Sequence, residues 1–91
     1  MSQYHTNNYY PVITNVEYPA FLALGVSGIP ATYDGWISQQ RQSNMERERV
    51  GERPVPVPVT ARQFKEFCDQ RGQGYVGQWL LHYAIEHGTL R

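Results

Sequence analysis

The sequence predicts one mainly helical α+β domain with about four helices and one small β-hairpin. Its 91 residues are too few for two domains. Several segments place apolar residues at helical spacing, and one segment, residues 53–59, alternates Pro with Val in the manner of a strand. A chain of this length has a small core, so dimerisation is a natural supplement to its stability.

Cysteine content and hydropathy indicate a cytoplasmic protein without a membrane partner. Cys68 is the single cysteine, so an intramolecular disulfide is excluded. No apolar run approaches the roughly 20 residues that span a bilayer. The first ten residues also lack the basic and apolar parts of a signal peptide.

The charge distribution is uneven although the formal net charge is zero. Residues 1–40 contain no Lys or Arg, whereas seven of the eight basic residues lie between Arg41 and Arg71, together with five acidic residues. This central excess of two positive charges is a modest bias, and it is compatible with phosphate contacts.

The N-terminal third predicts a flexible arm, a short strand and a short helix. Residues 1–9 are polar and resemble an arm, and residues 10–14 are typical of an edge strand. Pro19 suits the first position of a helix, which then runs to Leu24 and ends at Gly25.

A turn over residues 25–30 leads to a second predicted helix over residues 32–42, capped by Thr32 or Ser27. The residues at helical spacing on its inward face are Tyr33, Trp36, Ile37 and Gln40. Gly35 costs about 1 kcal/mol relative to Ala within a helix. We expect close approach of the preceding helix to compensate for it.

Residues 44–59 have two interpretations. The charge alternation over residues 45–50 and the Pro–Val alternation over residues 53–59 fit a β-hairpin with its turn near residues 50–52. The alternative is a polyproline II connector. We favour the hairpin, because Val55, Val57 and Val59 would share one buried face while the prolines lie on a free edge.

Residues 60–88 predict a pair of helices. Thr60 and Gln63 form a capping box before a helix that buries Phe64, Phe67 and Cys68 and ends before Gly72. The last helix spans residues 76–87 and stops at Gly88. Its apolar residues wrap more than one face, which predicts a central position or a homodimer interface through these C-terminal helices.

Three short motifs resemble known DNA-binding proteins. They are Leu24-Gly25-Val26-Ser27, Gly28-Ile29-Pro30-Ala31-Thr32 and Gly35-Trp36. The first resembles the turn of bacterial helix-turn-helix proteins, and the others are similar to winged domains of Mu-type phage repressors and transposases. The predicted layout of helix, turn, helix, wing hairpin and later helix also resembles that of phage excisionases. The resemblance covers residues 18–59. It implies a winged helix-turn-helix that regulates transcription in a phage or other mobile element.

The resemblance implies that the helix over residues 32–42 enters the major groove of double-stranded DNA and that a wing near Gly51 touches the backbone. Gln and Ser pair with base edges, while Arg grips guanine or phosphate. The groove residues would be Thr32, Ser38, Gln39, Arg41 and Gln42, and the backbone clamps would be Arg47, Arg49 and Arg53. The chain departs from the pattern because this helix is poor in basic residues and carries Asp34.

Other interpretations remain open for the same residues. Residues 39–53 also fit a solvated, charge-alternating surface. Residues 55–59 followed by two helices have the order of a ribbon-helix-helix protein, although the prolines suit that strand poorly. The main rival is a protein-interaction module, such as a small inhibitor or adaptor. Its exposed aromatic anchors would be Tyr4, Tyr9, Tyr10, Tyr75 and Trp79.

The sequence predicts neither an enzyme nor a cofactor or metal protein. His82 and Glu86 have the i, i+4 spacing of metal ligands, but no HExxH or paired-Cys motif accompanies them. We expect these two residues to form an ordinary surface pair. Gly25 to Gly28 lacks the spacing and the Lys of a phosphate-binding loop.

Overall fold

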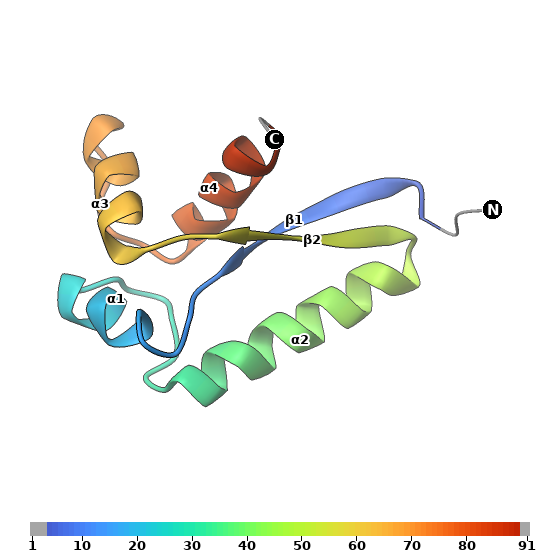
Figure 1. The fold of residues 1–91 in the computed structure, drawn as a ribbon, viewed down its shortest axis with the longest axis horizontal. Helices are drawn as coiled ribbons and strands as arrows, with labels where there is room; N and C mark the ends of the chain where they lie inside the picture. Colours follow the sequence, from blue (N-terminus) through green and yellow to red (C-terminus); the bar gives the residue numbers. More distant parts are fainter. Residues whose placement is uncertain (1–3, 90–91) are drawn as a thin grey trace.

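Four helices and two strands make up residues 4–89, the part of the chain that the computed structural model describes (Figure 1). In chain order they are β1 (Thr6–Val12), α1 (Tyr18–Leu24), α2 (Tyr33–Arg49), β2 (Glu52–Pro58), α3 (Ala61–Gln70) and α4 (Gln78–Thr89). The predicted mixed α+β class with four helices is confirmed. Within residues 4–89, every helix is too short or too polar to cross a membrane.

The two strands form a parallel pair, with Thr6 opposite Glu52 at one end and Val12 opposite Pro58 at the other. The predicted β-hairpin is therefore wrong. Residues 45–49, its expected first arm, instead continue α2 to a length of 17 residues. Glu and Arg are good helix formers and poor strand formers, so the alternating charges extend the helix. Gly51, with φ 87°, then turns the chain into β2.

The partner of β2 is a segment that the sequence suggested to be largely an arm. Residues 6–9 of the expected arm lie in β1, which begins four residues before the predicted strand. The Tyr9 side chain is half-buried and packs against the hydrophobic core. Residues 1–3 of the expected arm lie outside the described residues.

Helices cover both faces of the two-stranded sheet (Figure 1). Successive side chains of a strand point to opposite faces. The Asn8 amide donates a hydrogen bond to Asn44 of α2 at 3.0 Å, whereas Tyr9 lies against Gly88 of α4. The sheet is thus a middle layer with α2 on one side and α4 on the other, as parallel pairing requires.

The Pro–Val run is a strand with one buried face, as predicted. Val57 and Val59 are buried in the core and Val55 is half-buried, while Pro56 and Pro58 are exposed. Burial of two Val side chains contributes about 1.5–3 kcal/mol each. This favourable energy helps to hold β2 in place.

The short helix α1 packs against α3, where the rings of Phe21 and Phe64 lie 5.9 Å apart. Its contact with α2 runs through Tyr18, whose ring lies 5.6 Å from that of Tyr33. The helix ends at Gly25 in a left-handed conformation with φ 84°, as predicted.

Local capping predictions are confirmed for α3. The Thr60 hydroxyl accepts a hydrogen bond from the Gln63 N–H at 3.1 Å, and the Gln63 side chain accepts one from the Thr60 N–H at 2.9 Å. The Glu17 carboxylate adds a third acceptor, for the Ala61 N–H at 2.8 Å. The helix ends before Gly72, which has φ 64°.

Two glycines have roles other than the predicted ones. Gly35 faces the turn rather than the preceding helix, because an added Cβ would lie 3.0 Å from Pro30 and 3.1 Å from Thr32. Gly88 lies within α4 and does not end it. It is buried beneath Tyr9, and a Cβ there would lie 2.3 Å from the tyrosine ring. Close approach of β1 to α4 therefore requires glycine at this position.

Gly88→Ala is expected to lower the free energy of unfolding by about 1–3 kcal/mol, the usual cost of an overpacked contact, despite the better helix propensity of Ala. Urea denaturation of the full chain measures the change. Gly74→Ala is the matched control, because an added Cβ there meets nothing within 4 Å. Equal stability of the two variants would contradict the assigned role of Gly88.

Candidate functional site

The predicted DNA-reading side of α2 faces solvent. Ser38, Arg41 and Gln42 are exposed and, with Arg49, line a shallow depression on the outer face of the helix. Asp34 lies four residues before Ser38 and therefore shares this face. The helix is thus free along its outer side.

The structure does not bring all eight predicted DNA-contacting residues together. Gln39 lines a different groove, at the side of α2 next to β1. Arg47 lies 3.4 Å from the Glu52 carboxylate, and Arg53 lies on β2. Since the wing does not form, the two arginines and Arg49 are not neighbouring backbone clamps.

Thr32 acts as the N-cap of α2. Its hydroxyl accepts a hydrogen bond from the Gly35 N–H at 3.1 Å, and its backbone is extended as a cap requires. The cap prediction for this residue is confirmed. The Thr32 hydroxyl, predicted to contact DNA, therefore serves to cap α2.

Backbone hydrogen bonds define which side of each strand is free. The Val59 N–H donates to the Val12 carbonyl at 3.0 Å, and the Thr6 N–H donates to the Gly51 carbonyl at 3.5 Å. Peptide groups alternate in direction along a strand. Residues 6, 8, 10 and 12 of β1 therefore point toward β2, and residues 7, 9 and 11 point away from it.

The same alternation makes the two outer edges of the sheet chemically different. In β2 the outward positions include 54, 56 and 58, and all three are proline, so this edge offers carbonyl acceptors without donors. In β1 the outward positions are Asn7, Tyr9 and Pro11. Asn7 and Tyr9 offer two N–H donors and two carbonyl acceptors, whereas Pro11 is buried and has no N–H. A further strand can therefore pair with β1 but not along the proline run of β2.

A groove of about 220 Å³, lined on β1 by Asn8, Tyr10 and Pro11, lies next to this edge. Its floor includes Tyr10 and Pro11 of β1, and its walls include Gln39 of α2 and Leu81 of α4. None of the described residues that line it belongs to β2, which places it on the outer side of β1. We call this groove, with the outward backbone of Asn7 and Tyr9, the β1 edge site.

The apolar flank of α4 borders the β1 edge site. Leu81 and Ile85 share one flank of the helix and are 42% and 44% exposed. Tyr83 and His87 lie on the opposite flank, because two residues of offset turn the helix by about half a revolution. That flank faces β2, since both residues line a cavity with Val57.

Sequence reasoning missed the β1 edge site, although it expected aromatic anchors. Tyr9 and Tyr10 of that expectation lie in β1. Tyr4, Tyr75 and Trp79 are half-buried elsewhere. The Tyr75 hydroxyl donates to Asp69 at 2.7 Å. The sequence signal that could have identified this site is the proline alternation of β2, which removes the hydrogen-bond donors from the other outer edge of the sheet.

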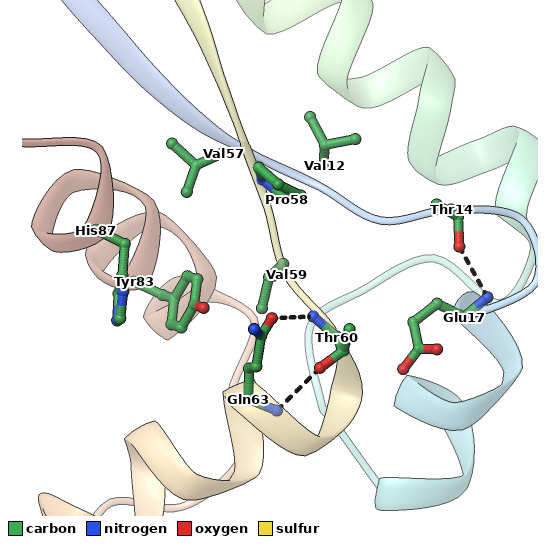
Figure 2. Close-up of a pocket in the computed structure, with 10 residues that line it drawn as sticks. All are labelled: Val12, Thr14, Glu17, Val57, Pro58, Val59, Thr60, Gln63, Tyr83 and His87. Carbon is green, nitrogen blue, oxygen red and sulfur yellow. Dashed lines mark hydrogen bonds between the residues drawn. The ribbon is translucent and has the colours of Figure 1, made fainter. Parts of the chain in front are cut away.

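A second cavity, of about 550 Å³, lies between the ends of the strands, α3 and α4 (Figure 2). Its polar side chains serve helix caps: Thr14 accepts from the Glu17 N–H, and Thr60 and Gln63 cap α3. His87 stacks on Tyr83 with ring centroids 4.0 Å apart. We assign this cavity no ligand, because its polar groups have a structural use.

His82 and Glu86 of α4 do not form the predicted surface pair. Glu86 binds Arg71 of the loop after α3, and His82 lies against the Trp79 ring at 4.8 Å. The pair does not form because Glu86 is engaged by Arg71, whose guanidinium also lies over the Phe67 ring. Between residues 4 and 89, no three His, Cys, Asp or Glu side chains gather as metal ligands would.

The shifted pKa values belong to structural groups. A hydrogen bond from Lys65 and another from Tyr75 lower the pKa of Asp69, and Asp69 in turn raises the pKa of Lys65. These three side chains link α3 to the following loop. Burial raises the pKa of the Cys68 thiol, which disfavours the nucleophilic thiolate.

No protein-family model, curated protein or solved structure matches this chain. Its function is therefore argued from the geometry of the residues themselves.

Thr32→Ala is expected to lower the free energy of unfolding by about 1 kcal/mol, because the Gly35 N–H loses its acceptor. Thermal or urea unfolding measures the loss. Thr32→Ser retains the hydroxyl and is expected to retain most of the stability. Ser38→Ala, on the exposed face of the same helix, is expected to stay within about 0.5 kcal/mol. A Thr32→Ala variant as stable as Ser38→Ala would exclude the cap.

Proposed function

We propose that this chain is a non-catalytic protein-interaction module that binds an extended segment of another chain by strand addition along β1. The observation that carries the proposal is the open edge of β1 beside a blocked edge of β2. In strand addition, main-chain hydrogen bonds supply affinity and flanking pockets select alternate side chains of the added strand.

The β1 edge site has the parts that strand addition needs. The outward groups of Asn7 and Tyr9 provide donor and acceptor pairs at the spacing of an extended peptide. The groove beside them contains Tyr10 and Leu81, which can hold apolar side chains. Its one charged lining residue, Arg47, already faces Glu52. The site therefore favours an extended, uncharged segment.

Sequence-specific DNA binding through α2 is the second candidate, and the exposed face with Ser38, Arg41 and Gln42 supports it. The charge of this face favours it less than strand addition. The arginines of this face, Arg41 and Arg49, are matched by Asp34 and Glu46, so the face has no net charge. Phosphate neutralisation supplies most of the affinity in DNA binding.

A displayed library of random extended peptides tests strand addition. Peptides selected on the dilute full-length chain are expected to slow hydrogen exchange at the Asn7 and Tyr9 amides. Asn7→Pro is expected to weaken their binding by at least about tenfold, because it removes an outward donor without removing a bond to β2.

Asn7→Thr is the matched control, since it retains the N–H and suits a strand. Its affinity for the selected peptides is expected to stay near that of the unaltered chain. Peptides that bind Asn7→Pro as tightly as the unaltered chain, or that leave both amides unprotected, would refute strand addition.

The DNA alternative makes a separate prediction. If α2 contacts DNA, the Arg41→Ala, Arg49→Ala double variant is expected to reduce the slope of log affinity against log salt by about 2. Arg62→Ala, on an exposed position of α3, is expected to leave the slope unchanged. Fluorescence anisotropy with duplex DNA at low salt measures both. Absence of any binding at low salt would end this alternative.

A further inference from the structure

We infer that the strand added to β1 is β1 of a second copy of this chain, so that two copies join through an antiparallel β1–β1 pair. This inference rests on the proposed function, because it names the segment that fills the β1 edge site. The result is a four-stranded sheet with the order β2–β1–β1–β2.

The hydrogen-bonding groups of β1 are complementary to themselves. With a two-fold axis at Asn8, Asn7 of one copy lies opposite Tyr9 of the other. Both residues are outward positions of β1 that carry an N–H, so each such pair exchanges two N–H to carbonyl bonds. The symmetry repeats the pair, which gives about four bonds. In this register Pro11 lies opposite His5, which is outside β1 and whose N–H already donates to the Gly51 carbonyl at 2.9 Å, so we expect no bond at that pair.

The charge of β1 also suits a second copy. Residues 6–12, TNNYYPV, carry no ionisable acid or base apart from the tyrosine hydroxyls. The formal net charge of the chain is zero. Like-charge repulsion across an antiparallel pair destabilises it. Self-pairing of this strand therefore meets no electrostatic barrier, either within the strand or between whole molecules.

The exposed flank of α4 gives the second reason for a symmetric partner. Leu81 and Ile85 lie on the side of α4 that borders the open edge. A strand from an unrelated peptide covers the backbone groups of β1 and can reach Leu81 in the groove, but Ile85 does not line that groove. A second copy brings its own α4 to the same face of the enlarged sheet, where the two Leu81 and Ile85 flanks meet across the axis. A single two-fold axis thus pairs the free backbone groups of β1 and covers the apolar flank of α4.

The other edge of the sheet limits the assembly to two copies. Each β2 keeps its prolines outward, and an edge with three carbonyls and no donors over positions 54–58 cannot accept a further strand. The pairing is therefore closed, as an isologous two-fold interface requires.

Sedimentation velocity of the full chain over a dilution series tests the inference. We expect a species of twice the 10.5 kDa chain mass that dissociates on dilution. Asn7→Pro removes two of the four bonds, and Leu81→Glu places a carboxylate in the α4 contact. Each is expected to raise the dissociation constant at least about tenfold.

Two matched controls separate the interface from general damage. Asn7→Thr retains the outward N–H. Leu22→Glu changes a leucine of similar exposure, 41%, that lies on α1 away from the edge. Both are expected to dissociate within about twofold of the unaltered chain, since they leave the interface intact. Circular dichroism checks that all four variants remain folded.

Hydrogen exchange supplies a readout that does not depend on a variant. The amides of Asn7 and Tyr9 are expected to become protected as concentration rises, whereas the Asn15 amide, in the loop after β1, is expected to change little. Protection that is independent of concentration would overturn the inference.

The outcomes separate the inference from the proposed function. A monomer at high concentration that still binds selected peptides in an Asn7-dependent manner would overturn the second copy and leave strand addition standing. A dimer unaffected by Asn7→Pro and Leu81→Glu would place the interface elsewhere and overturn the inference. A monomer without Asn7-dependent peptides would refute both.

Discussion

The parallel pairing of β1 with β2 is the interaction on which the rest of the structure depends. It joins residues 6–12 to residues 52–58, so all of α1 and α2 forms the crossover between the strands. A two-stranded sheet is marginal alone, and parallel strands need cover on both faces. That requirement places α2 on one face and α4 on the other. Asn8 reaches Asn44 on the first face, and Tyr9 lies on Gly88 on the second.

The prolines of β2 determine the direction in which this pairing can run. Because positions 54, 56 and 58 have no N–H, β2 bonds a neighbour on one side alone, through Arg53, Val55 and Val57. Val55 and Val57 also carry the buried apolar face of the strand, whereas Arg53 is exposed. Pairing and burial are thereby coupled, since slipping the register by one residue would lose both at once. The sheet cannot grow past β2, and β1 retains the edge open to other chains.

The sequence predicted the elements whose signals are local. The cap at Thr60, the termination at Gly25 and the buried Val face each depend on residues within a few positions of one another. The β1–β2 pairing could not be predicted in this way, because the partner of a strand lies far along the chain and leaves no local pattern. Residues 45–49 were misassigned for a related reason: alternating charge fits a helix surface as well as a strand. The exposed side of α2 was predicted correctly, whereas the open edge of β1 depends on topology.

The two candidate surfaces differ in how well water solvates them when no partner is bound. The outer face of α2 is polar and of balanced charge, so it is stable in water without a partner. The edge of β1 presents extended backbone groups to solvent, and Leu81 and Ile85 beside it are large apolar side chains at more than 40% exposure. Proteins commonly protect such edges with charge, proline or covering elements. This chain applies proline to β2 and leaves β1 uncharged. An edge protected on one side and open on the other is expected of a surface that pairs with another chain.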